Sequence, residues 1–287
     1  MRKVTIPAVL VLALALGGRP AWAQSRPLVT EDPETVPAGK ILFETGIDYA
    51  QDASYPVSGL RGNLWRIATF GLSFGVSPIA EIQLDGGVRD RLAIKSANPA
   101  AELAGVLRPA AVVGASTSDF EDLVVGAKIR FAAETPSRPA LAFRFSTRLP
   151  NAGNESGLGL DTTDFNAGFA AAKTVESVRI CANLGLGILG DPFRGDRQND
   201  VVNFGMSMAK AVRTGVEIVG ELNGRLSTRS GTPPPGTESR SAIRLGSRFT
   251  RGPVRLDAAL FFGITSDDPT WGFTFGGTWV FKAFDVK

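Results

Sequence analysis

The sequence predicts an all-β fold, a closed antiparallel transmembrane β-barrel of about twelve strands. Three observations lead to this prediction. Apolar and polar residues alternate with a period of two along most of the chain. The alternating runs are long, and the links between them are short and long in turn.

Turn-forming residues separate the alternating runs from one another. A typical strand of a soluble sheet has ~5–6 residues and a tilted membrane strand needs ~9–11, so runs of this length favour membrane strands. Aromatic residues near the ends of several runs suit the interfacial girdles of such a barrel. The predicted strands are 40–51, 64–77, 80–94, 120–134, 139–150, 160–175, 178–189, 200–211, 215–228, 239–251, 253–265 and 271–284.

Alternation alone does not say which face of the sheet is inside. In the run 253–265, Leu256 and Phe262 have one parity and Arg255 and Asp257 the other. A soluble sandwich buries the apolar face, whereas a membrane barrel turns that face to lipid and lines its lumen with the polar one.

The links between strands favour the barrel. Links after the even-numbered strands are tight, such as 77–79 and 252–253, whereas most links after the odd-numbered strands are longer and polar, such as 51–63 and 190–199. This asymmetry is typical of an outer-membrane barrel with periplasmic turns and external loops. A sandwich with crossover connections has no reason to sort its links in this way.

The start of the chain has the pattern of a secretory signal peptide. Arg2 and Lys3 precede an apolar run and an A-x-A site at 21–23, and the run is far shorter than the ~18 residues of a transmembrane helix. We therefore expect export to the outer membrane of a Gram-negative-type bacterium. The predicted parts are a signal peptide at 1–23, a periplasmic N-terminal tether at 24–39 and an outer-membrane β-barrel domain at 40–287.

Composition excludes several classes of function. The leader holds three of the 31 basic residues and no acidic residue, so the mature chain has 28 of each sign and no net charge. The sequence contains no basic tract, so a nucleic-acid partner is not expected. Histidine is absent, which excludes His-based triads and His-ligated zinc, and the single Cys181 excludes an intramolecular disulfide. We predict no cofactor, no metal, no catalytic residue and no enzymatic activity.

Two short motifs have a structural interpretation in preference to a functional one. The glycines at 185–190 match G-x-G-x-x-G, but they lie inside an alternating run instead of between a strand and a helix, so a nucleotide site is disfavoured. The stretch Asp161-Thr162-Thr163-Asp164 lacks further ligands at regular spacing, so we place Asp161 at an external rim and Asp164 in the lumen instead of in a metal site.

Two further stretches carry a family resemblance. RPLVTEDPETVPAGKILFETG, from Arg26, and GLGLDTTDFNAG, from Gly157 to Gly168, resemble the outer-membrane proteins of the meta-pathway of phenol degradation type. The resemblance covers essentially the whole mature chain. It implies an outer-membrane barrel tied to transport of aromatic or other small organic compounds, and it supplies no catalytic residues. The chain departs from many outer-membrane barrels in having three residues after Phe284, where an aromatic end assists the assembly machinery.

In a barrel, charged side chains on the polar parity line the lumen and tune which solutes pass. Strands four and five supply a basic wall, and the first and third strands supply acidic residues. These charges could equally pair with one another and fill a narrow barrel, because sequence does not show the free width of the lumen. The candidate selectivity residues are Glu44, Asp48, Glu81, Asp85, Lys128, Arg130, Arg144, Arg148, Glu217, Glu221, Arg244 and Arg248.

The leading functional hypothesis is a channel or transporter in outer-membrane lipid that passes small solutes by diffusion. The loop from Lys95 to Asp119 is either a constriction or lid, or simply an external loop. One alternative is a structural or surface-binding barrel with a plugged lumen. Another is a barrel-embedded hydrolase, which the lack of histidine disfavours. Substrate identity and oligomeric state are not predicted.

Overall fold

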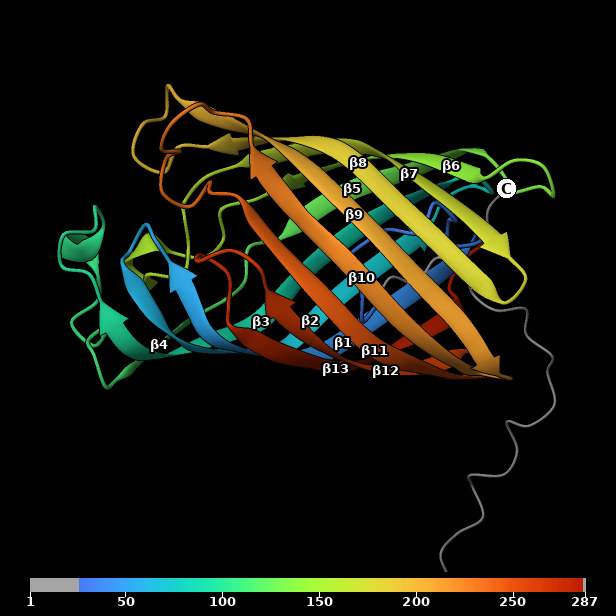
Figure 1. Cartoon of the computed structure of the whole chain (residues 1–287), viewed down its shortest axis with the longest axis horizontal. Helices are drawn as coiled ribbons and strands as arrows, with labels where there is room; N and C mark the ends of the chain where they lie inside the picture. Colours follow the sequence, from blue (N-terminus) through green and yellow to red (C-terminus); the bar gives the residue numbers. More distant parts are fainter. Residues whose placement is uncertain (1–25, 286–287) are drawn as a thin grey trace, which may run out of the picture.

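The computed structural model describes residues 26–285, which form one sheet closed into a barrel (Figure 1). The predicted signal peptide lies outside the described residues. The elements in chain order are β1 (Lys40–Tyr55), β2 (Leu60–Gly75), β3 (Ala80–Ala97), η1 (Ala104–Val106), β4 (Ser116–Asp119), β5 (Val124–Ala132), β6 (Ala140–Arg148), η2 (Asn154–Ser156), β7 (Asp164–Val175), β8 (Val178–Gly190), β9 (Gln198–Arg213), β10 (Val216–Ser227), β11 (Arg240–Arg251), β12 (Val254–Gly263) and β13 (Trp271–Lys282).

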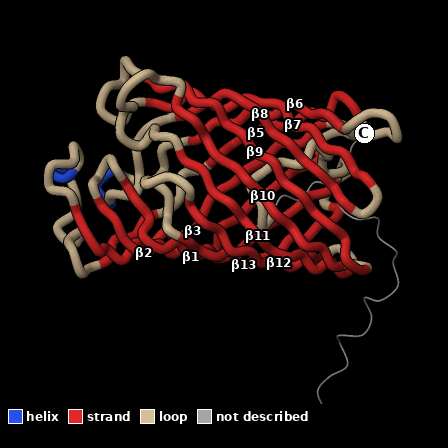
Figure 2. Tube along the Cα trace, viewed as in Figure 1, coloured by secondary structure: helices blue, strands red, loops and turns tan. Residues whose placement is uncertain are grey.

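The sheet closes between its first and last strands. β1 and β13 pair antiparallel from Lys40 opposite Lys282 to Gln51 opposite Trp271. The short β4 and the following β5 pair with successive stretches of β3, so together they make one stave. The barrel therefore has twelve staves, as predicted from the sequence, and Figure 2 shows strand structure all around it. β4 was not predicted because its four residues, STSD, lack apolar alternation.

The apolar face of the sheet points outward. On β12, Leu256 is 48% exposed and Phe262 46%, whereas Arg255 is 6% exposed and Asp257 3%. Apolar side chains are exposed in the same way around the barrel, among them Leu184 and Leu245. Such a surface suits lipid, so the closed barrel, and not the sandwich, accounts for the alternation.

The two ends of the barrel differ as the link lengths indicate. Long loops gather at the left of Figure 1, and tight turns lie at the right with the C terminus. One prediction is corrected: the link expected at 51–63 is only 56–59, because β1 and β2 extend far beyond the predicted strands. No helix within 26–285 has the length and apolar character to cross a membrane.

Candidate functional site: an occluded lumen

Residues 26–39, hereafter the N-terminal segment, lie inside the barrel and do not hang below it. At its start the Arg26 guanidinium donates a 2.7 Å hydrogen bond to Thr274 of β13 and lies 3.5 Å from a carboxylate oxygen of Asp257 on β12. Farther along, Val36 is only 1% exposed. The described part of the expected tether is therefore an internal plug, because its charges find partners on the polar inner wall.

Glycines on the inner wall make room for this segment. A Cβ atom added at Gly205 of β9 would lie 2.6 Å from the Thr30 hydroxyl, and one added at Gly276 of β13 would lie 2.6 Å from the Arg26 guanidinium. Contacts this short mean that a side chain at either position would force a neighbouring group to move, so glycine at these positions leaves room for the segment. The polar-parity glycines of the sequence thus provide the space that the N-terminal segment occupies.

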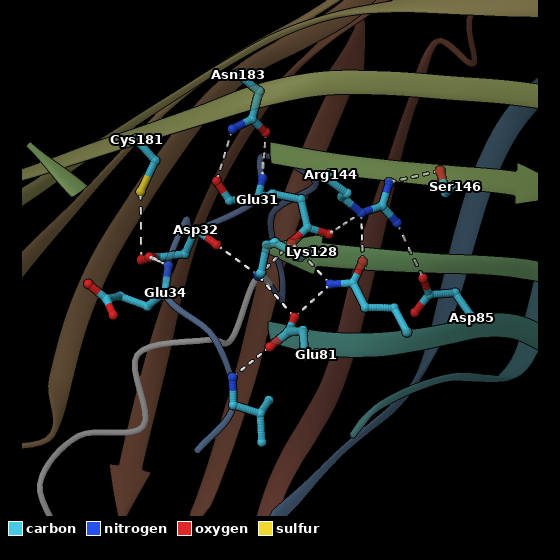
Figure 3. A network of polar contacts seen from close by, with 12 residues as sticks. Glu31, Asp32, Glu34, Glu81, Asp85, Lys128, Arg144, Ser146, Cys181 and Asn183 are labelled. Atoms are coloured by element: carbon cyan, nitrogen blue, oxygen red, sulfur yellow. Dashed lines mark hydrogen bonds and ion pairs between the residues drawn. The ribbon is translucent and has the colours of Figure 1, made fainter. Parts of the chain in front are cut away.

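A buried lysine binds the N-terminal segment to the basic wall, which β5 and β6 form (Figure 3). The ammonium of Lys128 on β5 lies 3.2 Å from Glu31, 3.1 Å from Glu81 of β3 and 2.8 Å from the backbone carbonyl of Asp32. The side chains of Lys128 and Glu81 are both fully buried. Glu81 also accepts a hydrogen bond from the Val36 backbone N–H. Each buried charge is thus paired, which a charge shielded from water requires.

Arg144 of β6 extends this network toward the lumen (Figure 3). It donates to Gln83 of β3 at 2.7 Å and lies 3.4 Å from Glu31 and 3.7 Å from Asp85. Burial alone raises the pKa of Glu31, but the cations of Lys128 and Arg144 outweigh burial and hold that pKa below its usual range. Glu31 is therefore held as a carboxylate inside the barrel.

The opposite wall binds the backbone of the N-terminal segment. Glu221 of β10 accepts hydrogen bonds from the N–H groups of Val29, at 2.9 Å, and Thr30. The Asn183 side chain of β8 accepts from the Glu31 N–H at 2.6 Å and donates to the Glu31 carbonyl at 3.0 Å. These side chains supply partners that a strand ladder would otherwise give to a buried backbone.

Two further ion pairs hold the middle of the segment near the tight-turn end. The Arg179 guanidinium of β8 binds both carboxylate oxygens of Asp32, at 2.5 and 2.6 Å. Arg130 of β5 pairs with Glu34. A bidentate arginine–carboxylate pair fixes direction as well as distance, so it orients the segment in the lumen.

All twelve candidate selectivity residues are on the inner wall, but they do not form an open charged ring. Four of them pair instead with wall residues: Asp85 with Arg144, Arg148 with Asp122 and Asp164, Glu217 with Arg248, and Arg244 with Glu221. The other eight contact the N-terminal segment: Glu44, Asp48, Glu81, Lys128, Arg130, Arg144, Glu221 and Arg248.

Sequence reasoning missed the plug residues themselves, chiefly Arg26, Glu31 and Asp32. A signal was present: the segment carries three acids within residues 31–34, and the predicted basic wall of the fourth and fifth strands offers cations to match. Charge complementarity between a short acidic stretch and a basic wall could therefore have placed the segment inside the barrel.

The loop between β3 and β4 covers part of the other end of the barrel. Its Ala111 is buried in an apolar cluster with Leu92 and Ile94 of β3 and Phe261 of β12. Neighbouring Val112 is more than half exposed, so only part of the stretch from Lys95 to Asp119, expected as a lid or as an external loop, packs inward, and its two ends belong to β3 and β4. Between this end and the N-terminal segment lies a cavity of about 630 Å³.

The remaining motifs take their structural roles. The glycines at 185–190 lie within β8, with no helix after them. Asp164 is buried and its carboxylate lies 2.6 Å from the Arg148 guanidinium, whereas Asp161 is exposed at the loop end. Within residues 26–285 no group of three or more Cys, Asp or Glu residues is arranged to hold a metal ion.

These features define an outer-membrane β-barrel whose lumen is occupied by its own N-terminal segment. The chain belongs to the family described as the MetA-pathway of phenol degradation, whose model matches residues 24–281. An outer membrane channel from Pseudomonas putida F1 has a similar fold, with a TM-score of 0.58 and 14% identity over 87% of this chain and 98% of that one. The NanC porin is similar at a TM-score of 0.52 and 5% identity, over 83% and 98%. No curated protein matches the sequence.

Proposed function

We propose that the protein is an outer-membrane channel for small organic solutes, in which the N-terminal segment must shift for a solute to pass. One observation carries this proposal: the cavity of about 630 Å³ in the loop half of the barrel is lined by both strand residues and Thr30 and Glu31 of the segment. The segment thus forms the floor of this cavity. Cavities of ~300–1,000 Å³ suit small molecules.

The way the segment is held supports its movement. Its N–H groups at Val29, Thr30, Glu31 and Val36 bond to side chains of the wall, and not to a strand ladder. Water or a polar solute entering the lumen can replace such contacts one at a time. Gly39, by contrast, donates a backbone hydrogen bond to Gly75 of β2 at 2.8 Å, so it makes a natural hinge at the end of the segment.

The family description and the cavity wall together support small aromatic or other organic compounds as solutes. The family is named for phenol degradation. The cavity is lined by Ala50, Leu64 and Phe261 as well as by arginines and asparagines, so it offers both apolar and polar surface. The similar channel from Pseudomonas putida F1 supports passage as the activity.

Liposome swelling tests this function. We compare the mature protein with a variant lacking residues 26–36, which keeps the hinge and the whole barrel. Faster swelling of the deletion variant than of the intact protein in small neutral solutes is the expected result. Equal, negligible swelling by both folded proteins would contradict passage through this lumen.

A second candidate is the non-conducting structural barrel. The observation that favours it is that the eight lumen residues named above are already engaged by the N-terminal segment. Under this hypothesis the ion pairs serve stability alone. The deletion variant would then be destabilised, and intact protein would pass no solute under any condition.

A further inference from the structure

Two arginines on adjacent strands face the cavity, and neither forms an ion pair with a carboxylate in residues 26–285. Arg225 of β10 and Arg240 of β11 are directly opposite in the antiparallel pairing, and both line the cavity. Like charges directly opposite one another destabilise a sheet. Their placement therefore calls for a compensating anion.

The hydrogen-bond acceptors of this pair in the described part of the chain are neutral backbone carbonyls. Arg225 donates to the backbone carbonyls of Glu238, at 2.9 Å, and Gly236, at 2.8 Å. Arg240 donates to the backbone carbonyl of Ser54 at 3.1 Å, and its Nε is buried without a hydrogen-bond partner. Within residues 26–285 neither guanidinium forms an ion pair, and the Glu238 carboxylate instead accepts from the Gly236 N–H at 2.8 Å.

The other arginines of the cavity are already neutralised. Arg66 lies 3.1 Å from Glu121, and Arg244 lies 3.3 Å from Glu221. Arg144 is the cation beside Glu31 described above. Among residues 26–285, the cavity arginines that form no ion pair are thus Arg225 and Arg240, and the carboxylates of Glu238 and Asp164 act on Arg225 only from beyond ion-pair distance.

The acids that line the cavity are also engaged elsewhere. Asp48 lies 3.8 Å from Arg26. Asp268 accepts from the backbone N–H groups of Ser241 and Thr265, at 2.9 and 3.0 Å, and from the Thr265 hydroxyl. Neither acid compensates the arginine pair.

Neutral polar and apolar groups surround the pair. Asn203 of β9 is directly opposite Arg225, and the nearby Asn223 has a buried side-chain oxygen without a partner. On β12, the strand next to β11, Phe261 is 9% exposed, and the Arg244 guanidinium lies over its ring, 4.8 Å from the centroid. The cavity therefore combines unpaired cations, amides and an aromatic face.

We propose that Arg225 and Arg240 form a binding site for the carboxylate of a small organic acid, with the apolar wall at Phe261 taking the body of the ligand. The inference rests on the proposed function, because the site lies in the lumen through which solutes are to pass. Charge-assisted hydrogen bonds from guanidinium groups to a carboxylate are about twice as strong as neutral ones, so an aromatic carboxylate binds here in preference to its neutral amide.

Calorimetric titration of the refolded mature protein in a non-ionic detergent tests this site. Benzoate and benzamide are the probes, since they share a ring and differ in charge. We expect benzoate to bind about tenfold more tightly, because hydrogen bonds to a charged group are about twice as strong as those to a neutral one. Equal affinities in the wild-type protein would overturn the proposal without recourse to any variant.

Matched substitutions locate the site. Arg225→Gln combined with Arg240→Gln should abolish the preference for benzoate, whereas Arg251→Gln should retain it. Arg251 is an exposed arginine at the opposite end of β11, so the control carries the same chemical change on the same strand. A preference that survives in a folded double variant would place the carboxylate elsewhere and contradict the assignment.

The channel function and this site fail separately. If benzoate is preferred but no solute swells liposomes, the site stands and the channel function fails. If neutral solutes pass but benzoate and benzamide bind alike, the channel function stands and the arginine site is overturned.

Discussion

Lys128 and Glu81 lie on neighbouring strands with their charged atoms 3.1 Å apart, and both side chains are fully shielded from solvent. This pair sits beneath the N-terminal segment and binds it through Glu31 and the Val36 N–H. Removing one partner of a buried pair leaves an uncompensated charge. The pair therefore makes barrel stability depend on contacts inside the lumen.

Lys128→Met should destabilise the barrel, since it leaves Glu81 and Glu31 without their shared cation. We expect the free energy of unfolding to fall by about 3–5 kcal/mol, measured by urea titration of the folded protein in lipid. Lys210→Met is the control, because Lys210 is exposed on β9 and should change stability by less than about 0.5 kcal/mol. Similar losses of unfolding free energy in the two variants would contradict a specific stabilising role for Lys128.

Gly205→Val should displace the N-terminal segment. The Cβ of the new side chain would start 2.6 Å from the Thr30 hydroxyl, so either Thr30 or the strand must move. Because the segment is held by side-chain contacts, we expect it to shift and conductance in planar bilayers to rise. Gly220→Val adds the same side chain to β10, where a Cβ meets only an ordinary 3.4 Å contact with Leu245, and should conduct like the wild type. Wild-type conductance in both variants would argue that the segment is not an obstruction.

Acid should loosen the N-terminal segment through Glu31. The pKa of Glu31 is lowered in the folded state because Lys128 and Arg144 outweigh its burial. The ionised Glu31 therefore stabilises the folded state. This stabilisation is complete at pH values above ~4.3, the ordinary pKa of glutamate, and it is lost as the pH falls through the lower pKa of the folded state.

Conductance measured from pH 7 downward checks this expectation. The wild type should conduct more at acid pH, below the ordinary glutamate range. Glu31→Gln should conduct more already at pH 7 and show a weaker pH response, since its site carries no charge to lose. An identical acid response in wild type and variant would assign the effect to other carboxylates.

Alternation predicted the barrel because membrane strands have one lipid face and one lumen face. Leu256 and Asp257 on β12 show this, since Leu256 is exposed and Asp257 is buried. The period of two is a local property of the backbone, so it can be read from the sequence alone.

The plug could not be predicted in the same way. Residues 26–39 have no period, and their partners, such as Glu221 and Asn183, are more than 150 positions away. Likewise β4 has only four polar residues, and its pairing with β3 depends on where the long β2–β3 hairpin ends. The position of the plug depends on charge complementarity between distant segments, and that of β4 on long-range pairing, so a local period reveals neither.

The most direct test of the account is a reversible lock between the N-terminal segment and the wall. A Cβ at Gly205 would lie 3.4 Å from the Cβ of Thr30, close to the ~3.5–4.5 Å of a disulfide. We therefore combine Thr30→Cys and Gly205→Cys in one chain that also carries Cys181→Ser. Its conductance is measured with the disulfide formed and again after reduction. Conductance that is absent when the disulfide is formed and returns on reduction is the predicted result. The same conductance in both states would contradict movement of the segment as the route by which the lumen opens.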